Sequence, residues 1–184
     1  MAVGLGLPFG RLDADRLERL AAWSLQFGAG ELRPSPWRSV FIPGVAEANV
    51  PTLLALAADA GLIVAESDPR RAIAACPGAP ACARGRVSTH ADAARLLEAA
   101  PQLLAGATVH VSGCTKGCAR RAPADLTLVG EEGGYAVVIR GATRDRPGAH
   151  MALGTILDRL KLLKSDGPLA TLSTERLAQV FEAP

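Results

Sequence analysis

Four cysteines form the chemically most informative pattern in this sequence. Cys76 and Cys82 are spaced C-x5-C, whereas Cys114 and Cys118 are spaced C-x3-C, and glycine or proline lies close to each pair. A structural zinc site usually takes two cysteines from a C-x2–4-C knuckle, so a five-residue spacer is awkward around one small tetrahedral ion. A cubane cluster instead offers four irons at separate corners. We therefore predict a [4Fe–4S] cluster on these four thiolates; zinc and free or disulfide-bonded cysteines are the alternatives.

The expected compartment is consistent with metal chemistry at these cysteines. The N-terminal segment has no basic leader, and no run reaches the length of about 18 apolar residues that a membrane span needs. We expect a cytoplasmic protein with no membrane partner. Because cytosolic thiols are kept reduced, two structural disulfides are disfavoured there.

Positive charge is concentrated where the cysteines are. The chain carries a formal net charge of +2, but residues 70–121 hold eight Lys and Arg side chains and only two acidic ones. The segment lacks interleaved aromatic residues and any nucleic-acid-binding motif, so nucleic acid is not the expected partner. A small polyanion or an anionic cofactor suits this charge better.

The N-terminal part of the chain is predicted to alternate strands and helices. Strands are expected at 3–9, 31–44 and 62–65, the second interrupted early by prolines. A helix capped by Asp13 should cover 14–27 with an apolar face formed by Leu17, Leu20, Ala21, Ser24 and Leu25, and a second, capped by Asn49, should cover 50–60. This order resembles a ferredoxin-like half.

The remainder of the chain is predicted to be a second α/β unit. Thr89 should open a helix that Pro101 ends, and 107–113 should be a strand that leads into the second cysteine pair. Residues 126–130 and 135–139 should form a hairpin, followed by helices within 150–165 and from Ser173. We predict two domains, 1–67 and 68–184, in an α/β (α+β) fold.

The cysteine motifs also resemble a known superfamily. "CPGAPAC" followed by "HVSGCTKGC" is similar to the cysteine motifs of the nitrite and sulfite reductase haemoprotein-like fold. That resemblance implies a ferredoxin-like half followed by a [4Fe–4S] half, with Cys76, Cys82, Cys114 and Cys118 as cluster ligands. It also implies that the chain corresponds only to the C-terminal of two repeats in that fold.

Within the superfamily, "LRPSPWRSVFIPG", "ACPGAPACARG" and "HVSGCTKGCARRAPADLTLVG" most resemble the precorrin-3B synthase family. The resemblance implies an oxidoreductase of the monooxygenase type that converts precorrin-3A to precorrin-3B in aerobic cobalamin biosynthesis. Tetrapyrrole carboxylates suit bidentate guanidinium pairing, and the candidate contacts are Arg33, Arg38 and Arg120, together with Lys116 inside the C-x3-C loop. Catalytic residues are not identified.

The resemblance leaves two alternative functions and several expected cofactors and partners. The family alternative is a sirohaem-dependent nitrite or sulfite reductase subunit, in which Cys118 would be the axial thiolate. The second alternative is a non-catalytic electron-transfer or tetrapyrrole-carrier module. A mononuclear iron or sirohaem, an electron donor, and either a missing N-terminal repeat or a homodimer partner are further expectations. Trp37 is expected to pack in the interior, with a place on the macrocycle face as the alternative. His110 is expected to be a hydrogen-bonded core residue, with a contact to the tetrapyrrole as the alternative.

Overall fold

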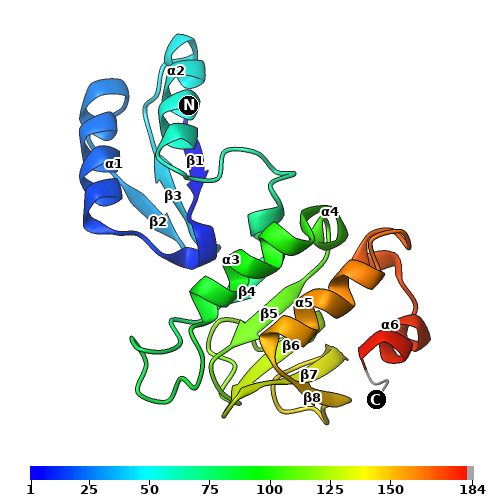
Figure 1. Ribbon diagram of the computed structural model, residues 1–184. Coiled ribbons are helices and arrows are strands. Elements are labelled where there is room, and N and C mark those ends of the chain that lie inside the picture. The colour runs from blue at the N-terminus through cyan, green and yellow to red at the C-terminus, as the bar shows by residue number, and fades with distance from the viewer. Residues whose placement is uncertain (182–184) are drawn as a thin grey trace. The chain divides into compact units, whose positions relative to one another are not determined.

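The structure is a computed structural model that describes residues 1–181, and it divides into two compact units, Met1–Arg71 and Ala72–Pro184. Each unit has its own sheet and helices (Figure 1). The domain boundary at residue 67 remains a sequence prediction. No helix in the described part of the chain is long and apolar enough to cross a bilayer.

The first unit has a small antiparallel sheet covered by two helices. Its strands are β1 (Val3–Gly6), β2 (Arg33–Ser35) and β3 (Ser39–Ile42), in the order β1-β3-β2. Helix α1 (Ala14–Phe27) connects β1 to β2, and α2 (Val50–Asp59) follows β3. Ile63 forms one antiparallel bridge to Gly6 on the free edge of β1. The resulting arrangement is a ferredoxin-like half in which the fourth strand is reduced to a single pairing.

Helix α1 begins as the sequence predicted, but its buried face is different. Asp13 accepts a hydrogen bond from the backbone N–H of Arg16 over 2.8 Å, which confirms the N-cap. The buried positions are Leu20, Trp23 and Ser24, whereas Leu17 and Leu25 are exposed. The predicted apolar face was therefore displaced, because Trp23 and not Leu25 packs into the core with Leu5, Ile42 and Leu53.

Four strand and cap predictions for this unit differ from the structure. Residues 31–44 form a hairpin of two short strands, because Arg38 takes a left-handed conformation (φ 57°) and turns the chain. The predicted strand 62–65 is one bridge, and Asn49 makes no side-chain cap on α2. The first strand ends at Gly6, before a 3-10 turn at Pro8–Gly10.

The second unit contains a five-stranded mixed sheet. Its strands are β4 (Ile73–Ala75), β5 (Val109–Ser112), β6 (Ala124–Glu131), β7 (Gly134–Gly141) and β8 (Ala149–Met151), ordered β4-β5-β6-β7-β8. The pairs β4–β5 and β5–β6 are parallel, and the pairs β6–β7 and β7–β8 are antiparallel. The predicted hairpin at 126–139 is confirmed, whereas β4 and β8 were not predicted.

Helices of the second unit pack on this sheet. Its helices are α3 (Thr89–Ala99), α4 (Pro101–Leu104), α5 (Leu153–Leu162) and α6 (Thr174–Phe181). Helices α3 and α5 lie side by side on one face of the sheet (Figure 1), where Leu96, Ile156 and Leu160 are fully buried. Pro101 opens α4 instead of only ending α3, as a proline in a first helical turn can.

Candidate metal centre at the ends of parallel strands

Both cysteine pairs lie at the carboxyl end of a strand. Cys76 directly follows β4, and Cys114 comes two residues after the end of β5. Because β4 and β5 are adjacent and parallel, their carboxyl ends lie at the same edge of the sheet. The backbone N–H of Cys76 continues the ladder by donating to the carbonyl of Val111 over 3.3 Å. The fold therefore brings the two loops together although 37 residues separate Cys76 from Gly113.

Direct hydrogen bonds join the two loops. The Gly113 N–H donates to the sulfur of Cys76 over 3.1 Å, and the Arg86 N–H donates to the Gly113 carbonyl over 3.0 Å. Inside the first loop, the Cys82 N–H donates to the Gly78 carbonyl over 2.7 Å. The Cys76–Cys82 segment is thus held to the turn that precedes Cys114.

Glycines allow the backbones of these loops to touch. A Cβ on Gly113 would lie 3.2 Å from the Cα of Gly85 and 3.3 Å from the Cα of Gly78. A Cβ on Gly85 would lie 2.6 Å from the Ala79 nitrogen. Gly78 also has a left-handed φ of 60°. Side chains at these three positions would push apart the backbones that surround Cys76.

The C-x3-C loop is held by hydroxyl groups that the sequence analysis did not single out. Ser112 donates to the carbonyl of Cys114 over 2.7 Å, and Thr143 donates to the carbonyl of Thr115 over 3.0 Å. Gly117, with φ 64°, lies so close to Thr143 that a Cβ would be 2.7 Å from its hydroxyl oxygen. Thr143 is 28 residues from Thr115 along the chain, and no local sequence signal connects it with the cysteines.

The four sulfurs differ in their exposure to solvent. Cys76 is buried, Cys82 and Cys114 are partly buried, and Cys118 is exposed; all four are free thiols. Within residues 1–181, no three Cys, His, Asp or Glu side chains surround the position of a single metal ion. Two neighbouring cysteine loops, glycine backbones and an N–H donor to sulfur suit a group wider than one ion, as an iron–sulfur cluster is.

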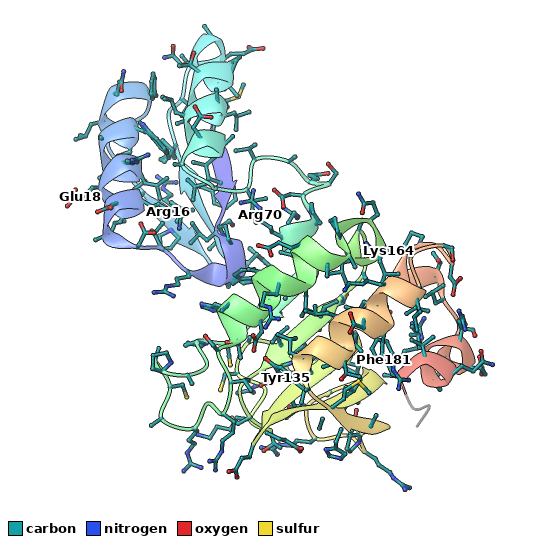
Figure 2. The ribbon with its side chains drawn as sticks, in the orientation of Figure 1. Arg16, Glu18, Arg70, Tyr135, Lys164 and Phe181 are labelled. Atoms are coloured by element: carbon teal, nitrogen blue, oxygen red, sulfur yellow. The ribbon has the colours of Figure 1, made fainter. Side chains whose placement is uncertain are left out.

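A buried tyrosine and an aspartate lie beside this site. Tyr135 is 2% exposed on β7 and points toward α3, where its hydroxyl donates to Asp92 over 2.6 Å (Figure 2). Burial raises the pKa of Tyr135 above its ordinary value of 10.0, and the hydrogen bond to Asp92 and the charges of Asp92 and Cys76 raise it further. Thr89, expected to cap α3, instead donates its hydroxyl to the carbonyl of Cys76. Sequence reasoning missed this group because its contacts are long-range.

The candidate basic residues occupy both units. In the second unit, Lys116 is exposed within the C-x3-C loop, and Arg120 is partly buried with two donor bonds to the Pro123 carbonyl. In the first unit, Arg33 forms an exposed ion pair with Glu31 over 2.8 Å, and Arg38 forms the left-handed turn before β3.

Two further side chains test expectations from the sequence. Trp37 is 81% exposed at the β2–β3 turn, so the prediction that it packs in the interior was wrong. His110, in contrast, is fully buried on β5, as predicted for a core histidine.

Comparison with known proteins matches both units. The family model "Nitrite/Sulfite reductase ferredoxin-like half domain" matches residues 1–60. A precorrin-3B synthase from Sinorhizobium sp is 38% identical over 193 residues, which cover 98% of this chain and 42% of that protein. The chloroplastic ferredoxin–nitrite reductase of Spinacia oleracea is 29% identical over 70% of this chain and 22% of its own length.

A solved structure has the same fold along nearly all of this chain. The Mycobacterium tuberculosis NirA protein superposes with a TM-score of 0.72 and 25% identity, over 97% of this chain and 37% of that one. The chain therefore spans less than half the length of each of these relatives. Sequence and fold together establish that the chain belongs to the nitrite and sulfite reductase superfamily.

Proposed function

We propose that this chain is the cluster-bearing part of a precorrin-3B synthase. The observation that carries the proposal is the position of the C-x5-C and C-x3-C loops at one edge of the parallel strands, joined by the bond between Gly113 and the Cys76 sulfur. The identity of 38% with a precorrin-3B synthase over 98% of the chain supports that activity over others in the superfamily. The oxidoreductase class is common to the named relatives.

Cys76, Cys82, Cys114 and Cys118 would hold a [4Fe–4S] cluster. Such a cluster supplies one-electron transfer to and from an external electron donor. The chain's own contribution is electrostatic and geometric. The Gly113 N–H stabilises negative charge on the Cys76 sulfur, and the exposed Lys116 in the second loop offsets the charge of four thiolates.

Basic side chains would bind the substrate. Precorrins carry acetate and propionate groups around the ring, and guanidinium groups pair with carboxylates through two parallel hydrogen bonds. Arg33, Arg38 and Arg120 are the proposed guanidinium contacts, and Lys116 is a proposed ammonium contact. Arg33 is exposed and donates from Nε and one terminal nitrogen to a single carboxylate oxygen of Glu31, so a substrate carboxylate would have to displace Glu31.

The proposed reaction inserts one atom of dioxygen into precorrin-3A, with lactone formation, and releases the other oxygen atom as water. Two electrons and two protons complete that balance, and the electron donor supplies the electrons. The residues of this chain would orient the macrocycle and neutralise its carboxylates, while the metal groups would supply the electron transfer and the oxygen chemistry. We place this activity in the cytoplasm. A mononuclear iron would be a further requirement for dioxygen chemistry.

An anaerobic preparation of the chain tests this proposal. We expect about four irons and about four acid-labile sulfides per chain, with a broad absorption near 400 nm that decreases on reduction. Cys76→Ser and Cys114→Ser should each lower the iron content, whereas Ser165→Ala, far from the cysteine loops in sequence, should not. A chain that binds a single zinc ion and no sulfide would contradict the proposal.

A sirohaem-dependent nitrite or sulfite reductase subunit is the second candidate. It is supported by the likeness to the NirA structure and to the spinach nitrite reductase. Reconstitution with sirohaem separates the two, because sirohaem binding would give a Soret band that changes in Cys118→Ser. Binding of precorrin-3A without that band, and its conversion when the missing part of a longer enzyme or a second copy is supplied, supports the first candidate. A cluster with neither binding activity would favour an electron-transfer module.

A further inference from the structure

Cys76 is held through three of its atoms. Its N–H donates to Val111 on β5, its carbonyl accepts from the hydroxyl of Thr89, and its sulfur accepts from the N–H of Gly113. It is also the one buried cysteine of the four, with 8% of its surface exposed. The position of this sulfur is therefore set by β5, by the turn after it and by the first residue of α3.

The first turn of α3 is also hydrogen-bonded to a side chain of the sheet. Thr89 is fully buried, and Asp92, three residues later, lies on the same side of that turn. Asp92 accepts the 2.6 Å hydrogen bond from Tyr135, which projects from β7 on the helix-covered face (Figure 2). The same helical turn thus contacts the backbone of Cys76 at one residue and a buried side chain of β7 at another.

Tyr135 remains a hydrogen-bond donor at all ordinary pH values. Burial is the largest cause of its raised pKa, and the negative charges of Asp92 and of a Cys76 thiolate act in the same direction. A phenol hydroxyl has one hydrogen to donate, and Tyr135 donates it to Asp92. The Tyr135 hydroxyl therefore keeps its proton, and with it the donor of this hydrogen bond, at the pH where a free tyrosine ionises.

We propose that Tyr135 and Asp92 are positioning residues for Cys76. The bond between them fixes the first turn of α3, and Thr89 transmits that position to the backbone of Cys76, so the sulfur is oriented before any metal group binds. The inference rests on the proposed function only for the identity of the group that Cys76 ligates. The positioning itself is a property of the chain without that group.

The test is residue-resolved alkylation of the reduced, metal-free chain. Iodoacetamide labelling followed by peptide mass spectrometry gives separate rates for Cys76 and Cys118. Tyr135→Phe keeps the ring and removes the donor, so we expect the Cys76 rate to rise about tenfold while the exposed Cys118 is unchanged. Asp92→Asn retains an oxygen that accepts from Tyr135 and should leave the Cys76 rate within about twofold of the wild type.

Thr127→Val is the matched control for a purely structural effect. Thr127 is fully buried on β6 and donates to the Gly141 carbonyl over 2.6 Å, so its loss removes a buried hydrogen bond in the same unit without contacting α3. It should lower the denaturation midpoint without changing the ratio of the Cys76 and Cys118 rates. An unchanged ratio in Tyr135→Phe, or the same change in Thr127→Val, would overturn the proposal.

A second measurement uses the loaded chain. Chelator-induced iron loss should be about tenfold faster in Tyr135→Phe and close to the wild-type rate in Asp92→Asn. If Tyr135→Phe does not fold, Asp92→Ala removes the acceptor from the half-buried side of the bond and undergoes the same two measurements. If the wild-type chain binds no cluster, the proposed function fails, whereas the alkylation ratio still decides whether Tyr135 and Asp92 position Cys76.

Discussion

The backbone N–H of Gly113 donates to the sulfur of Cys76 over 3.1 Å, so residues on two different loops share one hydrogen bond at the carboxyl ends of β4 and β5. A hydrogen bond to sulfur stabilises the thiolate form, which is the form that ligates metals. A Cβ at position 113 would crowd the Cα atoms of Gly85 and Gly78, at 3.2 and 3.3 Å. The two loops therefore depend on each other for their positions.

Substitution of Gly113 tests this dependence. In Gly113→Ala, the Cβ would lie 3.2 Å from the Cα of Gly85 and 3.6 Å from the Cys76 sulfur, and the crowded neighbours are mostly backbone atoms that cannot rotate away. We expect a loss of about 1–3 kcal/mol in the free energy of unfolding, measured with urea, and a lower iron content.

Gly154→Ala is the control for this substitution. Gly154 is exposed in α5, and a Cβ at this position would have no neighbouring atom within 4 Å. Because glycine is a poor helix former, the free energy of unfolding of this variant should rise by up to about 1 kcal/mol. Equal stability of the two variants would contradict the close contact at Gly113.

Local patterns in the sequence predicted local structure well. Helix α1 and its Asp13 cap were predicted because the capping residue and the periodic helix are adjacent in sequence. The cysteine loops were also recognised, since spacing and residue type carry that signal. Strands β4 and β8 were missed because three residues are too few to show a period.

Long-range contacts account for the rest. Thr89 was predicted to cap α3, but its hydroxyl donates to Cys76, 13 residues away. Tyr135 and Asp92 are 43 residues apart, and no local sequence pattern connects them. The turn at Arg38 uses a positive φ at a residue other than glycine, a conformation that composition does not indicate. Each of these features results from tertiary contacts that override local preference.

Titration of the single tyrosine tests the environment of Tyr135. The chain has one tyrosine, so tyrosinate absorbance near 295 nm reports this residue alone. Its pKa is raised, chiefly by burial, so we expect no ionisation near pH 10 in the folded chain and normal ionisation in urea. The same shift makes the wild type lose stability relative to Tyr135→Phe as the pH rises above 10, because the unfolded state then releases a proton that the folded state retains. Ionisation of the folded chain near pH 10 would contradict the buried hydrogen bond.

Acid denaturation tests the contact between Asp68 and Arg70. The hydrogen bond from the Arg70 side chain holds the pKa of Asp68 below its ordinary value of 3.8. Its contribution to stability is therefore complete above pH 3.8 and decreases as the pH falls through the lower folded-state pKa. The Asp68→Asn variant should have a lower free energy of unfolding than the wild type, measured by urea denaturation. This difference should be largest at pH 7 and should become smaller below pH 3.8.

Arg70 contributes more than this ion pair. Its guanidinium also donates to the carbonyls of Gly61 and Leu62, over 2.7 and 3.1 Å. Arg70→Ala should lower the free energy of unfolding by about 1–3 kcal/mol at pH 7, because it leaves these acceptors without their donor. The exposed Arg71 is the control, and Arg71→Ala should change stability by less than about 0.5 kcal/mol. Equal effects of the two substitutions would contradict the role of Arg70.

The left-handed turn at Arg38 gives a test of tetrapyrrole binding. Arg38→Gly removes the guanidinium while favouring the observed φ of 57°, so the hairpin should persist and the free energy of unfolding should stay within about 1 kcal/mol of the wild type. The probe is uroporphyrin, which carries acetate and propionate groups, and binding is followed by quenching of tryptophan emission, to which Trp37, 81% exposed, and the buried Trp23 both contribute. We expect a Kd about tenfold higher in Arg38→Gly, because a hydrogen-bonded ion pair is lost. Arg38→Lys keeps the charge without the bidentate geometry, so its Kd should lie between those of the wild type and Arg38→Gly. Arg19→Ala, an exposed charge loss on α1, should leave the Kd unchanged, and a Kd as high in this control as in Arg38→Gly would show that net charge alone governs binding.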